Sequence, residues 1–271
     1  MLGSAEHLHM EIHFLGSGGG RWVTLTQKLR TGGIRLHAEA KVHLDPGPGA
    51  VLSMAQAGLN PLDTDAVFVT HSHPDHYTDS HVMIEAITRG MRTRRGVFGG
   101  SRSVVLGEGD AGPVVTRYHL GKVGETHVIT PGGTVSTLSF RVRGLEARHS
   151  DPTTVGLSFE FEDGVVAYTS DTEYFQGMSH GYEEARVLII NVIRPASRRI
   201  PWHLCTEDVI KILEEVKPEL AILNHFGMNM IGVASREAER VQKATGVRTV
   251  AARDFMRVVV NEGIEVESGV R

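Results

Sequence analysis

The chain carries the hexapeptide His71-Ser72-His73-Pro74-Asp75-His76 directly after the apolar run Ala66-Val67-Phe68-Val69-Thr70. The apolar and β-branched residues of that run predict a buried strand. Pro74 cannot continue a strand ladder, so it forces a turn. Three imidazoles and one carboxylate therefore lie on a sharp loop at the end of a strand. Because these are ligands that zinc and similar divalent metals prefer, we interpret the loop as metal-binding rather than as a solvated, histidine-rich loop.

Three further candidate ligands stand at the ends of other predicted strands. They are His149 after residues 142–147, Asp171 after residues 165–170 and His225 after residues 220–224. A polar residue at the tip of an apolar strand is typical of a site at one rim of a sheet. Taken singly, each has another interpretation: a surface histidine, a turn residue or helix cap, and a satisfied core histidine. Together with the hexapeptide, we expect them to complete a metal site.

Composition limits the class of protein. The chain has 271 residues, of which 41% are hydrophobic and 22% charged, as in ordinary globular proteins. No apolar stretch approaches the roughly 20 residues that span a bilayer, and no secretory signal is evident, so we expect a cytoplasmic protein without membrane contact. The single cysteine, Cys205, excludes an intrachain disulfide. The net charge of -4 means that nucleic-acid binding requires a local basic patch.

The periodic pattern begins at Met10, so we expect a leader or added remnant over residues 1–9 and a single domain over residues 10–271. Helices are expected over 50–57, 79–88, 207–216 and 235–245, and a hairpin is expected from strands 155–161 and 165–170. The first half is rich in strands and the second alternates strands with helices, which predicts two sheets with helices outside. The glycine loop 16–20 is interpreted as a tight turn, because it lacks the lysine of a phosphate-binding loop.

The spacing His-x-His-x-Asp-His resembles the signature of the metallo-β-lactamase superfamily, and the resemblance covers nearly the whole chain. It implies an α+β fold, an αββα four-layer sandwich of two mixed sheets with helices outside. It also implies two divalent metal ions, with zinc preferred and manganese or iron as alternatives. In the pattern of that family, His71, His73 and His149 hold the first ion, Asp75, His76 and His225 hold the second, and Asp171 bridges both.

The chemistry that such a centre implies is hydrolysis at a phosphorus or carbonyl atom. A metal-bound water has its pKa lowered to about 7, and two ions about 3.5–4 Å apart hold a bridging hydroxide and neutralise charge on the substrate. Asp75 is expected both to bind metal and to orient the attacking oxygen. Arginine suits phosphate recognition, and two arginine groups are candidates for substrate binding or, alternatively, for a solvated surface. They are Arg89, Arg92, Arg94 and Arg95, and Arg198 and Arg199.

The stretch Pro201-Trp202-His203-Leu204-Cys205-Thr206 resembles the tRNase Z-like phosphodiesterase branch of the superfamily. There, a histidine at the start of this helix protonates the leaving oxygen, and His203 is the matching residue; the alternative is a surface histidine. The chain departs from that branch at residues 191–194, where Asn-Val-Ile-Arg offers no carboxylate to pair with His203. It also shows no long arm for a tRNA body. The departures favour a smaller phosphodiester over transfer-RNA processing.

We therefore predict a binuclear metal-dependent hydrolase, in first place a phosphodiesterase or ribonuclease-like enzyme. Its expected partner is a small anionic substrate or short nucleic acid, and a homodimer is one expected assembly. One alternative is a thioester, ester or lactone hydrolase, similar to glyoxalase II or to lactonases. Another is a non-catalytic, metal-binding regulatory protein. An oxygen-handling di-iron protein is disfavoured, because that branch has a glutamate at the position of His73.

Overall fold

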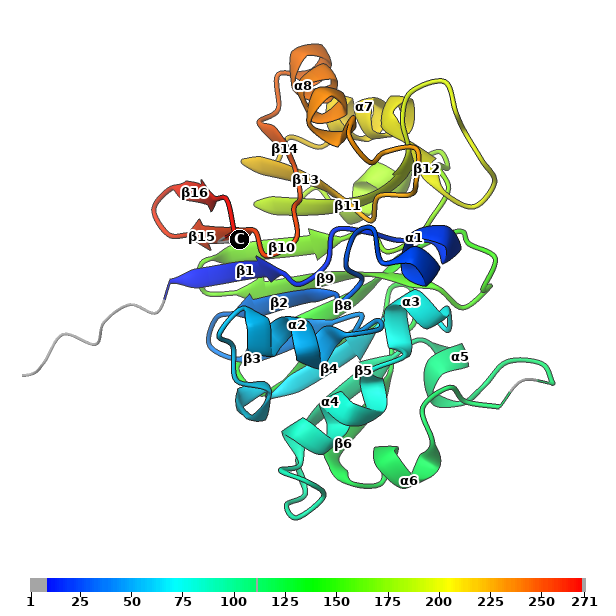
Figure 1. The fold of residues 1–271 in the computed structure, drawn as a ribbon, viewed down its shortest axis with the longest axis vertical. Coiled ribbons are helices and arrows are strands. Elements are labelled where there is room, and N and C mark those ends of the chain that lie inside the picture. The colour runs from blue at the N-terminus through cyan, green and yellow to red at the C-terminus, as the bar shows by residue number, and fades with distance from the viewer. Residues whose placement is uncertain (1–8, 111, 270–271) are drawn as a thin grey trace, which may run out of the picture.

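The computed structural model describes residues 9–110 and 112–269, which form two β-sheets with helices outside them (Figure 1). The first sheet contains β1 (Met10–Phe14), β2 (Ile34–His37), β3 (Lys41–Leu44), β4 (Ala66–Val69), β5 (Arg95–Gly100), β6 (Val123–Val128), β15 (Arg257–Val260) and β16 (Ile264–Glu267). The second contains β7 (Thr134–Thr137), β8 (Phe140–Glu146), β9 (Val155–Phe161), β10 (Gly164–Tyr168), β11 (Val187–Arg194), β12 (Leu204–Cys205), β13 (Leu220–Asn224) and β14 (Thr249–Ala251). Both sheets are mixed, as expected.

The strand order explains where a site can form. The first sheet runs β16-β15-β1-β2-β3-β4-β5-β6, and its strands β3 to β6 are parallel. The second runs β14-β13-β11-β10-β9-β8-β7, with β12 beside β11, and its strands β10, β11, β13 and β14 are parallel. In each parallel set the carboxyl ends of the strands share one edge of the sheet. Loops that leave these ends are therefore neighbours in space.

Helices cover the outer faces of the two sheets (Figure 1). They are α1 (Arg21–Thr26), α2 (Ala50–Gln56), α3 (Pro74–Tyr77), α4 (Ser80–Ile87), α5 (Arg102–Val105), α6 (Arg117–Leu120), α7 (Thr206–Glu215) and α8 (Ala234–Thr245), with 3-10 turns η1 (Pro61–Asp63) and η2 (Met178–Gly181). α2, α4 and α5 pack on the first sheet, and α7 and α8 pack on the second. The αββα sandwich is thus confirmed. None of the described helices has the length and apolar character that a membrane span requires.

The sequence of strand β4 is apolar throughout because both of its faces are buried. Ala66 and Phe68 face the core between the two sheets, whereas Val67 and Val69 face the core beneath the outer helices. Phe68 contacts Phe159 of the other sheet edge-on, with ring centroids 5.3 Å apart. Both faces of the strand are buried, so neither face tolerates the alternating polar residues of an exposed sheet. This rigid strand carries the metal-binding loop at its end.

The predicted elements agree closely with the observed ones. The helices expected over 50–57 and 79–88 are α2 and α4, and the expected hairpin is β9–β10. α7 begins one residue earlier than expected, at Thr206, because Cys205 acts as its N-cap. The backbone N–H of Cys205 donates to the carboxylate of Asp208 at 3.2 Å, which satisfies a donor at the helix start.

Candidate metal centre

The seven predicted ligands converge from the ends of four strands. The loop after β4 and the short helix α3 supply His71, His73, Asp75 and His76, the segment after β8 supplies His149, the turn after β10 supplies Asp171, and the residue after β13 is His225. Two of these turns are tight: Ser170 and His225 have positive φ angles of 57° and 61°. The structure brings all seven side chains into overlapping groups whose ligand atoms lie within 4.8 Å of one another.

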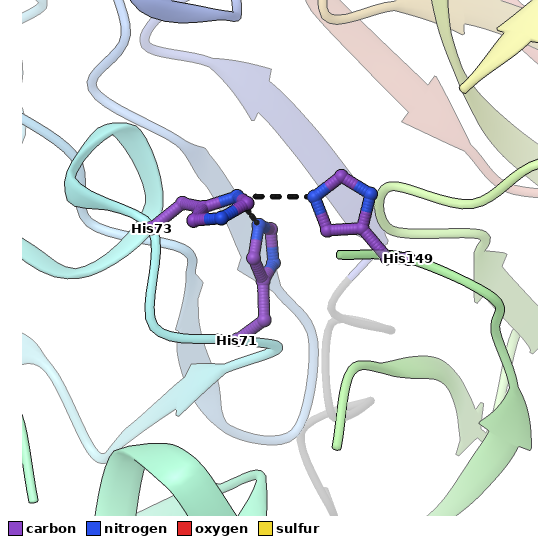
Figure 2. Close-up of side chains that lie close together, drawn as sticks. All are labelled: His71, His73 and His149. Carbon is purple, nitrogen blue, oxygen red and sulfur yellow. Dashed lines mark hydrogen bonds between the residues drawn. The ribbon is translucent and has the colours of Figure 1, made fainter. Parts of the chain in front are cut away.

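The first group consists of three imidazoles, His71, His73 and His149 (Figure 2). Nδ1 of His73 lies 3.0 Å from Nε2 of His71 and 3.0 Å from Nε2 of His149. In a tetrahedral zinc site with Zn–N bonds of about 2.0–2.1 Å, ligand nitrogens are about 3.3 Å apart. The spacing of the three nitrogens therefore suits one such ion.

The second group contains Asp75, His76 and His225. Nε2 of His225 lies 3.1 Å from Nε2 of His76 and 3.3 Å from Oδ2 of Asp75. Asp171 lies between the two groups: its Oδ1 is 3.3 Å from Nε2 of His225, and its Oδ2 is 3.9 Å from Nε2 of His149. This is the position from which one carboxylate can reach two ions.

Outer hydrogen bonds fix which ring nitrogen faces the centre in three of the histidines. Nδ1 of His149 donates to the carbonyl oxygen of Trp202 at 2.8 Å. Nδ1 of His76 donates to Oδ2 of Asp45 at 2.8 Å. Because the Thr70 hydroxyl donates to the same carboxylate at 2.8 Å, it accepts from Nδ1 of His71 at 3.1 Å. In all three rings the Nε2 lone pair is left facing inward, as metal ligation requires.

Three supporting residues were not predicted as part of the site. Asp45 accepts from the backbone N–H of Thr70 at 2.7 Å and from the Tyr168 hydroxyl at 3.0 Å, in addition to His76. Asn191 donates from Nδ2 to Oδ1 of Asp171 at 2.9 Å. For Asp45 a signal existed, since it directly precedes the turn residues Pro46-Gly47-Pro48-Gly49. Tyr168 and Asn191 look like ordinary strand residues in the sequence.

Asp151 supports the hexapeptide loop itself. Its Oδ2 accepts from the backbone N–H of Ser72 at 3.0 Å and from the Ser72 hydroxyl at 2.7 Å. The same oxygen accepts from the Ser103 hydroxyl at 2.5 Å. These hydrogen bonds outweigh the effect of burial and hold the pKa of Asp151 at about 2, so the carboxylate is ionised. Asp151 thereby ties the loop between His71 and His73 to the segment that carries His149.

The electrostatics of the cluster favour a bound cation. Burial holds the pKa of His71 well below its usual value, so its ring is neutral and free to ligate. Burial also opposes ionisation of Asp171, yet His225 and His76 outweigh it and hold its pKa well below the usual range. For His76, the carboxylates of Asp45, Asp75 and Asp171 overcome burial and raise the pKa. Negative charge that favours a proton at Nε2 of His76 equally favours a metal ion there, so the residues present fit a pair of divalent ions.

His203 also reaches this centre. Its Nε2 lies 3.4 Å from Oδ2 of Asp171, and its ring centroid lies 4.9 Å from that of His149. The sequence showed no acidic partner for His203 at residues 191–194, and the structure places Asp171 beside it instead. That neighbour could not be identified from sequence, because it belongs to a turn on another strand.

The arginines after α4 lie away from the centre, so the structure favours a surface role for them over the substrate binding that was considered. α4 runs back along the sheet from the metal-ligating end of β4 to the start of β5. Nη2 of Arg95 lies 2.8 Å from Oδ1 of Asp65, which precedes β4, whereas the ligands follow β4. Arg94 donates to the carbonyl of Val123 at the start of β6. The residues at this opposite end of the strands are Arg89, Arg92, Arg94 and Arg95.

The second arginine group divides in two. Arg199 forms an ion pair with the buried carboxylate of Asp208, so its role is to hold the loop to α7. Arg198 is exposed on the same loop, which ends at His203. Only Arg198 of this pair remains a candidate for contact with substrate.

A separate group on the outer face of the first sheet comprises Glu11, His13 and His37. Its ligand atoms are already engaged: Arg257 pairs with Glu11, and Nε of Arg35 donates to Nε2 of His37 at 3.0 Å. Two guanidinium groups beside it disfavour a cation. This group is therefore an ion-pair network and not part of the metal centre.

Comparisons with known proteins agree with this geometry. Residues 40–226 match the beta-lactamase superfamily domain. A protein of Methanocaldococcus jannaschii, MJ1374, whose function is uncharacterised, is 41% identical over 94% of this chain and 97% of its own length. Ribonuclease Z of Thermococcus kodakarensis is 24% identical over 94% of this chain and 96% of its own.

Among solved structures, the metallo-beta-lactamase fold protein YhfI from Bacillus subtilis superposes with a TM-score of 0.73 at 18% identity. The superposition covers 92% of this chain and 98% of YhfI. Three observations lead to the same conclusion: the match to the family domain, the observed fold and the grouping of the candidate ligands. The chain belongs to the metallo-β-lactamase superfamily, with ribonuclease Z-like proteins among its relatives.

Proposed function

We propose that the protein is a binuclear metal-dependent hydrolase that cleaves phosphodiester bonds in a nucleotide or short nucleic acid. The observation that carries the proposal is the position of His203, whose Nε2 lies 3.4 Å from Oδ2 of Asp171. When a ribose phosphodiester is cleaved, the ribose oxygen departs as an alkoxide, which is a poor leaving group and needs a proton donor. The leaving group of an activated acyl compound needs no such donor. A histidine beside the bridging carboxylate is placed to supply that proton.

The residues of the centre have distinct roles in this proposal. His71, His73 and His149 would hold one ion, and Asp75, His76 and His225 would hold the other, with zinc favoured by the imidazole-rich ligand set. When bound, two such ions supply a water activated near neutral pH and neutralise charge on the substrate oxygens. Asp75 also accepts from the backbone N–H of Gly20 at 2.8 Å, which orients its carboxylate toward the site. From there Asp75 would direct the attacking oxygen.

His203 is held in place by its own loop. Its Nδ1 donates to the carbonyl oxygen of Pro201 at 3.1 Å, so the ring presents Nε2 to the centre. The side chain is part-buried, with 20% of its surface exposed, so it lies where a leaving group exits to solvent. A protonated ring would keep one N–H on Pro201 and give the other to the departing oxygen.

Both tryptophans of the chain are exposed, and each is a near neighbour in sequence of a residue at the centre. Trp22 is 71% exposed and lies two residues after Gly20, which contacts Asp75. Trp202 is 45% exposed and directly precedes His203. Exposed indole rings serve as stacking surfaces for nucleic-acid bases. They support a substrate with planar bases, as does the similarity to a protein named Ribonuclease Z.

The experiment compares three substrates with zinc-loaded protein: bis-p-nitrophenyl phosphate, a ribodinucleotide and an acyl thioester. We expect His203→Ala to slow ribodinucleotide cleavage by about 10²- to 10⁴-fold, the usual contribution of a general acid. Cleavage of bis-p-nitrophenyl phosphate should change far less, because p-nitrophenolate leaves without a proton. The exposed His180 gives a matched control, and His180→Ala should leave both rates unchanged. Faster thioester turnover that is indifferent to His203→Ala would overturn the proposal.

A further inference from the structure

A basic pocket lies beside the metal centre, between α8 and the loop that follows β11. Its volume is about 380 Å³, and its lining includes Arg198, Arg236, Arg240, Asn229 and Glu237. Arg198 and Arg236 are exposed, and within residues 9–110 and 112–269 neither has a carboxylate within 4 Å. Because the chain as a whole is acidic, this excess of positive charge is a local feature rather than a general property of the surface.

The acidic residue of the pocket does not cancel this charge. Glu237 is buried, and its Oε2 accepts from the backbone N–H of Ala196 at 3.1 Å. Its Oε1 lies 3.9 Å from Nε of Arg240. The carboxylate thus fastens the loop to α8 and leaves Arg198 and Arg236 facing solvent. The loop and the helix that carry these two arginines are thereby held side by side.

The same strand connects the pocket with the metal centre. Asn191 of β11 contacts Asp171, and three residues later Arg194 donates from Nη1 to Oδ1 of Asn229 in the pocket lining. Three residues of a strand span about 10 Å. Among the described residues, Nε of Arg194 is buried and has no hydrogen-bond partner. A strand of nucleic acid bound at the metals would reach the pocket within a short run of nucleotides.

α8 extends the basic surface beyond the pocket. Arg236, Arg240 and Lys243 follow one another at i, i+4 and i+7, so they share one face of the helix, and all three are exposed. Proteins that bind single strands without sequence preference combine such a positive track along the backbone with exposed aromatic rings that stack on bases. Both features occur here: the exposed Trp202 directly precedes His203, and Arg198 lies on the same loop.

We propose that this pocket and the exposed face of α8 bind backbone phosphates of a single-stranded nucleic acid while another phosphodiester of the same strand lies at the metals. The inference rests on the proposed function and specifies its substrate as an oligonucleotide rather than a mononucleotide. Arg198 and Arg236 are the main contacts, with Arg240 and Lys243 continuing the track. None of these residues belongs to the metal centre, so their loss should affect long substrates selectively.

The test uses zinc-loaded protein and a labelled, cleavage-resistant phosphorothioate 12-mer, whose binding is followed by fluorescence anisotropy between 50 and 200 mM salt. The double variant R198E/R236E should bind at least tenfold more weakly. The slope of log affinity against log salt should fall by about 1.4, or about 0.7 for each lost phosphate contact. R89E/R92E gives the matched control, with the same change of charge at the opposite end of the sheet, and should change affinity less than twofold.

Two further readouts separate the possible outcomes. The circular dichroism spectrum and the thermal unfolding midpoint of R198E/R236E should match those of the wild type, which verifies that the variant is folded. Equal losses of binding in R198E/R236E and R89E/R92E, or no loss in either, would overturn the inference, as would a wild type that does not bind the oligonucleotide. If oligonucleotide binding depends on Arg198 and Arg236 but the protein cleaves no phosphodiester, the result supports nucleic-acid binding by the pocket and contradicts the proposed function.

Discussion

At the scale of single residues, the metal centre depends on a glycine that is not itself a ligand. A Cβ on Gly19 would overlap the imidazole of His225. Gly19 donates from its backbone N–H to the carbonyl of Phe226 at 3.2 Å, which fixes this close approach next to the ligand. His225 itself has a positive φ of 61°, a backbone conformation that residues other than glycine seldom adopt. The glycine loop is not the tight turn that the sequence predicted: Gly18 bridges Phe226 in parallel, so residues 16–20 run beside the segment that carries His225 and shape the second ligand group.

Gly19→Ala should therefore displace His225 without unfolding the protein. We expect metal content, measured by plasma mass spectrometry after dialysis, to fall from about two ions to about one per chain, because the first group does not use His225. Gly263→Ala is the control, since a Cβ there meets no atom within 4 Å. Unchanged metal content in Gly19→Ala would show that His225 is not a ligand.

The candidate ligands could be proposed from sequence because each lies in the segment that follows an apolar strand, a relation that is local in the chain. The supporting residues could not, since Asn191 and Tyr168 become part of the site only through contacts between strands. The arginines after α4 were misplaced for a similar reason. Sequence order shows that Arg94 follows the hexapeptide, but only the direction of α4 shows that it lies at the other end of the sheet.

At the scale of elements, an ion-pair ladder joins the strands at one edge of the first sheet. Arg257 of β15 pairs with Glu11 of β1 and, at 2.8 Å, with Glu267 of β16. Arg257 and Glu267 are directly opposite each other in the register. The hydrogen bond from Arg257 lowers the pKa of Glu11 from 4.5 to about 2, against the opposing effect of burial. Cross-strand charge pairs of this kind stabilise a sheet edge.

The lowered pKa predicts how stability depends on pH. A carboxyl group with a depressed pKa contributes stability above its unfolded pKa, and that stability is lost as the pH falls from about 4.5 toward 2. Because Glu11 and Arg257 are part-exposed, we expect Glu11→Gln to cost about 1 kcal/mol at pH 7 rather than the full value of the shift. The difference from wild type, measured by urea unfolding, should shrink at pH 3. A difference that does not vary with pH would contradict the pairing.

Secondary structure was more predictable than the contacts between its elements. The apolar periodicity and the Gly and Pro stops placed α2, α4 and the β9–β10 hairpin to within two residues of each end. The N-cap of α7 was less predictable, since Cys205 is a rare cap and its role depends on the Asp208 carboxylate three residues later.

At the scale of the whole molecule, the metal centre lies where the two sheets meet. Asp45 follows β3 of the first sheet, and its Oδ2 accepts from Tyr168 of β10 in the second. Tyr168 in turn accepts from Asn191 of β11, which also holds Asp171. One buried network therefore spans the sandwich and orients ligands from both sheets. The sandwich was foreseeable from the alternation of strands and helices and from the ligand spacing, whereas this network required the strand order.

The central claim is that the two halves of the ligand set hold two separate ions. Anomalous diffraction from crystals of the zinc-loaded protein at the zinc edge tests it most directly. We predict two peaks about 3.5–4 Å apart, one among His71, His73 and His149 and the other among Asp75, His76 and His225, with Asp171 between them. A single peak, or peaks away from these residues, would contradict the binuclear account.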